Sequence, residues 1–260
     1  MELIILLTLG FSKVCEKASD WLKENQWNVL FLDLPSELEP FLMAYVKGRI
    51  DEKTFWNNLS TLTGLADPFI NSLKFRYQTI LRSVKRKYRD DEKIVCYRDL
   101  DSYIKLHEVI EKILILEFKN RIGSDLKLEK WRDVLIEEEK ISKSSWNHAS
   151  ENILEEAEEN STNVISYEGS LQSLKRLKRG PIKVKVMLLK DYWKSPLGML
   201  RTVMWKYGID NIPDKEMIHY LRLQQKYLEL IIRSKDLEKA YESWETIVQK
   251  LPRELSMLYS

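Results

Sequence analysis

Five short runs of apolar residues divide the chain, and longer segments with helical periodicity separate them. The first two runs, residues 2–10 and 28–34, are almost continuously apolar, which is typical of parallel strands that helices cover on both faces. The third and fourth runs are residues 93–97 and 163–167. In the fifth, residues 182–189, lysines alternate with valines, which indicates an edge strand. The pattern predicts an α/β fold with a mostly parallel sheet of about five strands.

The segments between these runs differ greatly in length. Residues 35–92 and 100–160 are far longer than a crossover helix needs, so we expect a helical insertion at about each of these ranges. Residues 1–190 would then form an α/β core that carries both insertions. Residues 191–260 contain three further helical patterns, and we expect them to be C-terminal helices packed on the core.

The second run leads directly into an acidic turn. Asp33 is followed by Leu-Pro-Ser, and it can either act in chemistry at the end of the strand or close the turn by accepting from backbone amides of residues 34–37. Ser36 and Glu39 have the spacing of a capping box, which predicts that a helix begins at Ser36.

Composition and charge narrow the classes of protein that fit. The chain has 42 basic and 40 acidic residues, and its net charge of +2 gives no general reason to expect a nucleic-acid or lipid partner.

No segment approaches the roughly 20 apolar residues of a membrane span, and Glu2 stands where a signal peptide has basic residues. Cys15 and Cys96 have no metal-binding spacing, so we expect free thiols in a reducing cytoplasm. Abundant Lys, Glu and Ile resemble the composition of thermophile proteins.

Polar residues follow several of the predicted strands. The carboxyl ends of parallel strands meet at one edge of the sheet, called the carboxyl edge below, where open α/β sheets bind ligands. Acids gathered there can share a proton, as general acid and base, or bind a divalent cation. We therefore expect catalytic acids at Asp33, Asp99 and Glu168, and a divalent-cation site at Asp33, Asp99 and Asp101. The expected substrate-binding residues are Ser12, Arg98, Tyr167 and Ser170.

These acids also have a purely structural interpretation. Asp99 and Asp101 precede or begin the helix predicted near Ser102, and either can cap it. The three histidines lie far apart in helical segments without H-x-x-x-H spacing, so we do not expect an imidazole metal site. The leading hypothesis remains a small-molecule or metal site at the carboxyl edge, with a hydrolase-like reaction as one outcome.

Two basic stretches, residues 82–89 and 174–185, favour an alternative. Both interleave cations with apolar residues, the pattern that contacts a nucleic-acid backbone. Both also lie where a helix ends before a strand, and cations there stabilise the helix terminus, which is the favoured interpretation. The alternative is a non-enzymatic protein that binds a protein or nucleic-acid partner through its helical lobes and these stretches. Its expected nucleic-acid contacts are Lys85, Arg86, Lys87, Arg89, Lys175, Arg176, Lys178 and Arg179.

The order of the motifs, including "KIVCYRDLD" and "NVISYEGSLQSLKRL", resembles a superfamily that joins TraB-type pheromone-shutdown proteins, ChaN-like haem-binding lipoproteins and erythromycin esterases. The resemblance covers about residues 1–190. That family has Gly-x-x-His after the first strand, Glu after the second and another Gly-x-x-His near the penultimate strand. By position these fall near residues 10–13, on Asp33 and near residues 167–170, and both histidines are missing here. The resemblance therefore implies a divergent member that binds a ligand without cleaving it.

Overall fold

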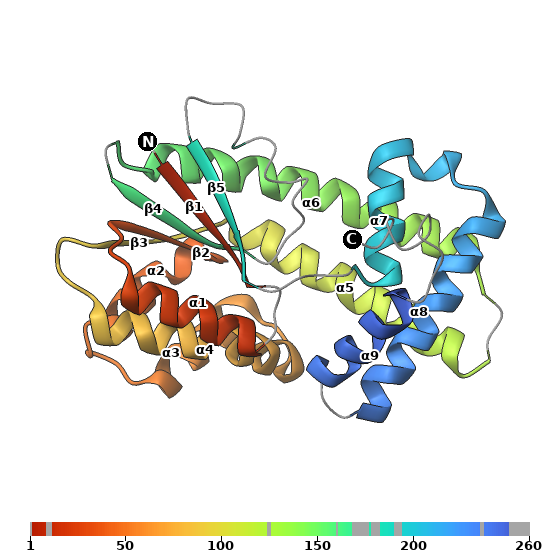
Figure 1. The fold of residues 1–260 in the computed structure, drawn as a ribbon, viewed down its shortest axis with the longest axis horizontal. Coiled ribbons are helices and arrows are strands. Elements are labelled where there is room, and N and C mark those ends of the chain that lie inside the picture. Colours follow the sequence, from red (N-terminus) through yellow and green to blue (C-terminus); the bar gives the residue numbers. More distant parts are fainter. Residues whose placement is uncertain are drawn as a thin grey trace. The chain divides into compact units, whose positions relative to one another are not determined.

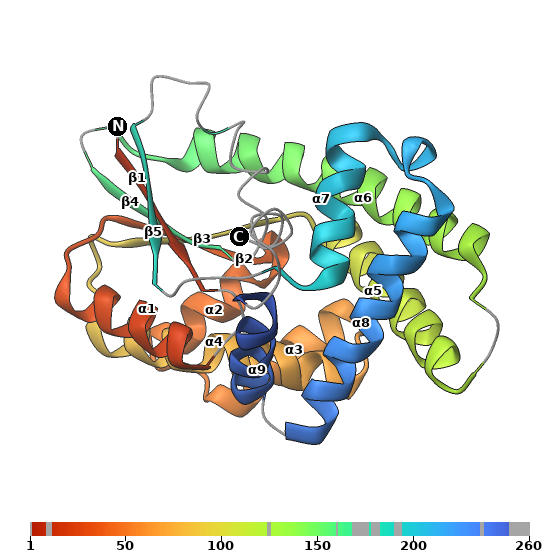
Figure 2. The same ribbon diagram turned by 45° about the vertical axis from the view of Figure 1, so that its right-hand side comes forward.

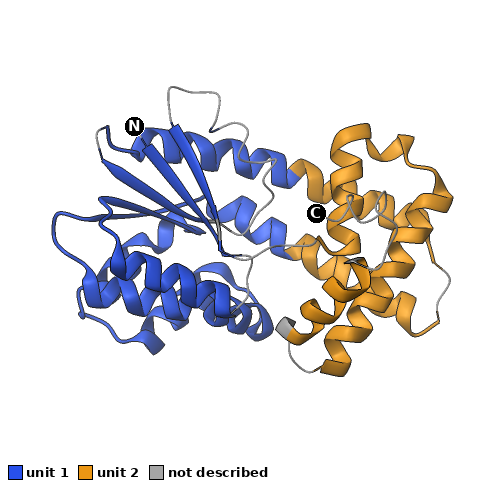
Figure 3. Ribbon diagram, in the orientation of Figure 1, with its two compact units in different colours: residues 1–107, 141–190 blue, residues 108–140, 191–260 orange. Residues whose placement is uncertain are grey.

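A computed structural model shows two compact units in the chain (Figure 3). Unit 1 contains residues 1–107 and 141–190, and unit 2 contains residues 108–140 and 191–260. Two long helices, α5 (Leu100–Arg121) and α6 (Leu128–Glu156), contribute to both units. The structure describes residues 2–8, 12–123, 126–159, 161–167, 177, 183–189, 194–234 and 237–249.

In the described residues, unit 1 is built on a five-stranded sheet in which every strand pair is parallel (Figure 1). The strand order is β3-β2-β4-β1-β5, so β5 lies at an edge, as its alternating lysines and valines predict. The expected α/β fold with a mostly parallel sheet is confirmed. The strands are β1 (Glu2–Leu7), β2 (Val29–Pro35), β3 (Lys93–Arg98), β4 (Thr162–Tyr167) and β5 (Lys183–Leu188).

Helices cover both faces of this sheet, which explains the continuous apolar runs (Figure 2). Leu6 and Leu32 pack in the core on the side of the first four helices, whereas Ile5 and Phe31 pack with Trp146 and its neighbours on α6. Cys15 and Cys96 are buried and unlinked, as predicted. The first four helices are α1 (Ser12–Glu24), α2 (Glu39–Val46), α3 (Glu52–Thr63) and α4 (Asp67–Lys87).

The start of α2 differs from the prediction. A short 3-10 turn, Ser36–Leu38, comes first, and the α-helix begins at Glu39. The Glu39 carboxylate accepts a hydrogen bond from the backbone amide of Cys96 at 3.2 Å, so it does not complete a capping box with Ser36. Cys96 lies on β3, the other edge strand, whose outward amides need partners. The predicted capping box is therefore wrong, because the edge strand recruits its carboxylate.

Unit 2 is helical in its described residues. Buried aromatic side chains anchor it: Trp131 on α6 and Trp244 on α9 are each 1% exposed. Arg132 donates to the carbonyls of Ile209 at 2.6 Å and Ile212 at 2.8 Å, which fixes the turn between two helices. No helix in the described part of the chain is long and apolar enough to cross a membrane. The C-terminal helices are α7 (Pro196–Tyr207), α8 (Asp214–Ser234) and α9 (Leu237–Gln249).

Candidate functional site at the carboxyl edge

A partly buried ion pair joins the ends of two neighbouring strands at the carboxyl edge. Asp33, near the end of β2, accepts hydrogen bonds from Arg98, the last residue of β3. Arg98 Nε donates to one carboxylate oxygen, and Arg98 Nη2 donates to the other at 3.3 Å. The two side chains are only 12% and 13% exposed, so each charge depends on the other for its stabilisation.

The surroundings of Arg98 fix the orientation of its guanidinium group. Arg98 Nη1 donates to the hydroxyl of Ser145 on α6 at 3.2 Å. The guanidinium carbon lies 5.6 Å from the ring centroids of both Tyr97 and Trp146, within the range of a cation–π interaction. In the structure the guanidinium of Arg98 ties β2, β3 and α6 together, and its role in binding substrate stays a prediction.

Asp99 is the N-terminal cap of α5. Its Oδ1 accepts from the backbone amide of Ser102 at 2.8 Å, the geometry of a helix cap. Its other carboxylate oxygen, Oδ2, is buried and has no hydrogen-bond partner among the described residues. Leaving a buried acceptor unsatisfied costs about 1–3 kcal/mol, and more for a charged group. The cap on α5 thus uses one oxygen of Asp99, and the other oxygen is buried without a donor among the described residues.

The predicted divalent-cation site is not assembled. Within the described ranges, no group of three or more His, Cys, Asp or Glu side chains could hold a metal ion. Asp33 is occupied by Arg98, and the exposed Asp101 forms an ion pair with Lys105 at 2.6 Å along the surface of α5. The physical reason is that each acid has a partner of its own: Asp33 pairs with Arg98, Asp99 accepts from the amide of Ser102, and Asp101 pairs with Lys105.

Other predicted site residues lie outside the described part of the chain. Glu168 and Ser170 are not described, and neither are the side chains of Ser12 and Tyr167. Their proposed catalytic and substrate-binding roles therefore stay predictions.

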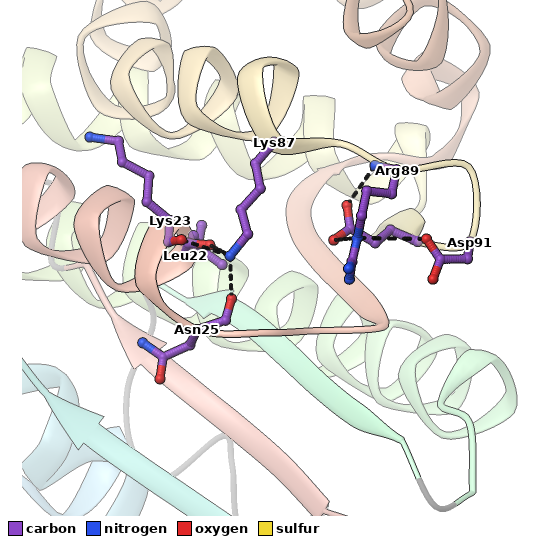
Figure 4. Close-up of polar contacts among 7 residues, drawn as sticks. Leu22, Lys23, Asn25, Lys87, Arg89 and Asp91 are labelled. Carbon is purple, nitrogen blue, oxygen red and sulfur yellow. Dashed lines mark hydrogen bonds and ion pairs between the residues drawn. The ribbon is translucent and has the colours of Figure 1, made fainter.

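The first basic stretch stabilises helix termini and turns (Figure 4). Lys87, in the last turn of α4, donates to the carbonyl oxygens of Leu22 at 3.1 Å, Lys23 at 2.7 Å and Asn25 at 2.6 Å. Its ammonium group therefore caps the C-terminal end of α1. Arg89 pairs with Glu92 at 3.2 Å. Lys87 thus acts at the C-terminal end of a helix, but this helix is α1 and not its own helix, α4.

The nucleic-acid alternative also involves Lys85 and the second basic stretch. The Lys85 ammonium lies 4.3 Å from the ring centroid of Tyr45, a cation–π contact within unit 1. Lys175, Arg176, Lys178 and Arg179 lie outside the described residues, so their contact with nucleic acid stays a prediction.

Several residues around this edge were not expected from the sequence. Ser145 and Trp146 lie in the middle of α6, and Tyr77, on α4, donates to the carbonyl oxygen of Asp33 at 3.3 Å. Ser166 on β4 has a buried hydroxyl without a hydrogen-bond partner in the described residues. A polar residue inside an apolar strand was a signal for Ser166, whereas the helical residues carry no local signal of their role.

Comparisons of the chain with family models, curated proteins and solved structures found no match. The resemblance to the superfamily of TraB-type proteins, ChaN-like lipoproteins and erythromycin esterases therefore stays a prediction. Function has to be inferred from the geometry of the carboxyl edge.

Proposed function

We propose that unit 1 binds a small polar molecule at the carboxyl edge of its sheet, and that this molecule donates a hydrogen bond to Asp99. The observation that carries the proposal is the buried Oδ2 of Asp99, which lacks a donor among the described residues. Parallel α/β sheets place ligands at this edge, and a buried acceptor there gains most from a ligand that supplies the missing donor.

The charges at this edge indicate the chemical class of the ligand. Arg98 is neutralised by Asp33, so the next residue, Asp99, supplies a negative charge without a cation at hydrogen-bonding distance. A hydroxyl or an ammonium group satisfies such an oxygen, whereas a phosphate or a second carboxylate would be repelled. We therefore propose a polyol or a small ammonium compound as the ligand.

The same geometry favours binding over the hydrolase-like reaction expected from the sequence. Paired acid–base chemistry needs two carboxyl groups within reach of the same substrate. Asp33 is held by Arg98, and the described residues do not fit a divalent cation. A fixed scaffold with one buried acceptor that lacks a donor is suited to recognition.

Thermal-shift measurements on the wild type and Asp99→Asn test the proposal. Asparagine caps a helix as well as aspartate does, so this variant keeps the bond to Ser102 and presents an amide donor in place of Oδ2. With a panel of sugars, polyols, amino acids and polyamines, we expect a compound that raises the melting temperature of the wild type and not of Asp99→Asn. Magnesium and manganese in the same panel test the cation prediction.

Asp101→Asn is the matched control, because Asp101 is an exposed acid two residues further along the chain. It should respond to the compound as the wild type does. A compound that stabilises Asp99→Asn and the wild type equally would contradict binding at Asp99. Stabilisation by the divalent cations alone would favour the metal site over the proposal.

A further inference from the structure

In unit 2, helix α5 carries a row of exposed apolar side chains, called the α5 row below. Leu114, Ile115, Phe118 and Ile122 are 49%, 46%, 63% and 65% exposed. Residues three, four, seven or eight apart lie on the same face of a helix, so these side chains form one continuous row. Single exposed apolar residues are ordinary, but a contiguous row of large ones marks an interaction surface.

Opposite charges stand at the two ends of the α5 row. Glu111 is four residues before Ile115 and seven before Phe118, so it lies on the same face at the N-terminal end. Arg121 follows Phe118 by three residues and lies at the C-terminal end. Both residues are exposed. The surface therefore has an acid, an apolar centre and a base in sequence along one helix face.

We infer that the α5 row is the contact surface for a second copy of this chain, with the two α5 helices antiparallel about a two-fold axis at the level of Leu116. Glu111 and Arg121 are each five residues from Leu116, so each copy's acid faces the other copy's base. Leu114 and Phe118 are each two residues from it and face one another. A two-fold contact repeats both interactions, which makes this surface complementary to itself.

The charges also select the antiparallel arrangement. Parallel helices in register would place Glu111 against Glu111 and Arg121 against Arg121, and like charges across an interface oppose association. Only the antiparallel arrangement pairs unlike charges at both ends of the α5 row.

A depression beside the α5 row fits the same contact. It has a volume of about 250 Å³, below the roughly 300–1,000 Å³ of small-molecule pockets, so it suits one side chain better than a metabolite. Ile115 belongs to both the row and the depression, and in the antiparallel pair Phe118 of the second copy lies near it. The lining residues are Lys112, Ile115, Leu116, Lys130, Asp133 and Val134.

Sedimentation velocity of the full chain over a range of concentrations tests this inference, and we expect the wild type to dimerise reversibly. Glu111→Arg and Arg121→Glu each bring like charges together, and each should raise the dissociation constant about tenfold or more. The double variant Glu111→Arg/Arg121→Glu restores unlike pairs and should restore the wild-type dissociation constant. Phe118→Asp should abolish the dimer.

Phe75→Asp is the matched control, because Phe75 is a 55% exposed phenylalanine in unit 1. It should dimerise as the wild type does, and circular dichroism should show that every variant is folded. A wild type that stays monomeric at all concentrations would overturn the inference. So would a double variant no more dimeric than the single variants, or a Phe75→Asp variant as impaired as Phe118→Asp.

Discussion

Burial makes the side chains of Asp33 and Arg98 dependent on one another. Removing one member of a buried pair leaves the other charge desolvated without compensation. Asp33→Ala should therefore lower the free energy of unfolding by more than about 1 kcal/mol, up to the roughly 3–5 kcal/mol of a fully buried pair, and Asp33→Asn should also destabilise because it removes the charge that neutralises Arg98. Urea denaturation of these variants measures the effect. The sequence suggested turn closure or chemistry for Asp33, whereas the structure gives it a cation on the next strand.

The exposed pair of Asp101 and Lys105 provides the control for this prediction. Its side chains are 76% and 54% exposed, so Asp101→Ala should change stability by no more than about 1 kcal/mol. If Asp33→Ala had an equally small effect, the pair at the carboxyl edge would not be the dependent, desolvated pair described above.

The raised pKa of Glu117, in unit 2, should make the stability of the protein depend on pH. Burial raises its pKa above the ordinary value of 4.5, and hydrogen bonding to Gln224 at 2.9 Å opposes that shift. The folded state therefore binds the proton more tightly than the unfolded state does. This contribution to stability is present below pH 4.5 and is lost as the pH rises through the raised pKa.

Glu117→Gln removes this titration and keeps an oxygen acceptor for Gln224. We expect the variant to gain stability over the wild type at neutral pH and to lose that advantage at acid pH. Urea denaturation at both pH values measures the difference. A variant that is equally or less stable than the wild type at neutral pH would show that the ionised carboxylate is adequately solvated.

At the level of secondary-structure elements, Lys87 links the ends of two helices. Its ammonium group donates to three carbonyl oxygens at the C-terminal end of α1, where a cation is favoured. Lys87→Met keeps the apolar stem and removes the donors, and it should lower the free energy of unfolding by about 1–2 kcal/mol. The exposed neighbour Arg86 is the control, and Arg86→Met should stay within about 0.5 kcal/mol of the wild type. Equal effects of the two substitutions would contradict the capping role.

The strands were predictable because apolar continuity is a local signal. The apolar run over β1 indicates a strand that is buried on both faces, and the alternating lysines of β5 indicate an edge strand. The start of α2 was not predictable, since Glu39 bonds to Cys96, a residue on a strand that comes much later in the chain. Local spacing describes the helix terminus correctly only when no tertiary partner competes for its side chains.

For the whole molecule, the sequence predicted an α/β core with helical parts but not the grouping of residues 108–140 with the C-terminal helices. Helical periodicity looks the same whether an apolar face is buried or exposed, so the sequence alone does not show the α5 row.

Only some of the residues of the candidate site could be predicted from the sequence. Strand ends pointed to Asp33 and Asp99, whereas the pairing of Arg98 and the contribution of α6 depend on tertiary packing.

The free energy of unfolding of Asp99→Asn, measured in urea without any ligand, decides whether Asp99 is reserved for a ligand or satisfied by the fold. If Oδ2 serves a ligand, replacing it removes an uncompensated buried charge while the cap on Ser102 remains. The variant should then be as stable as the wild type, or more stable by up to about 2 kcal/mol. A loss of more than about 1 kcal/mol would mean that Oδ2 makes a structural hydrogen bond, and it would contradict the proposed site.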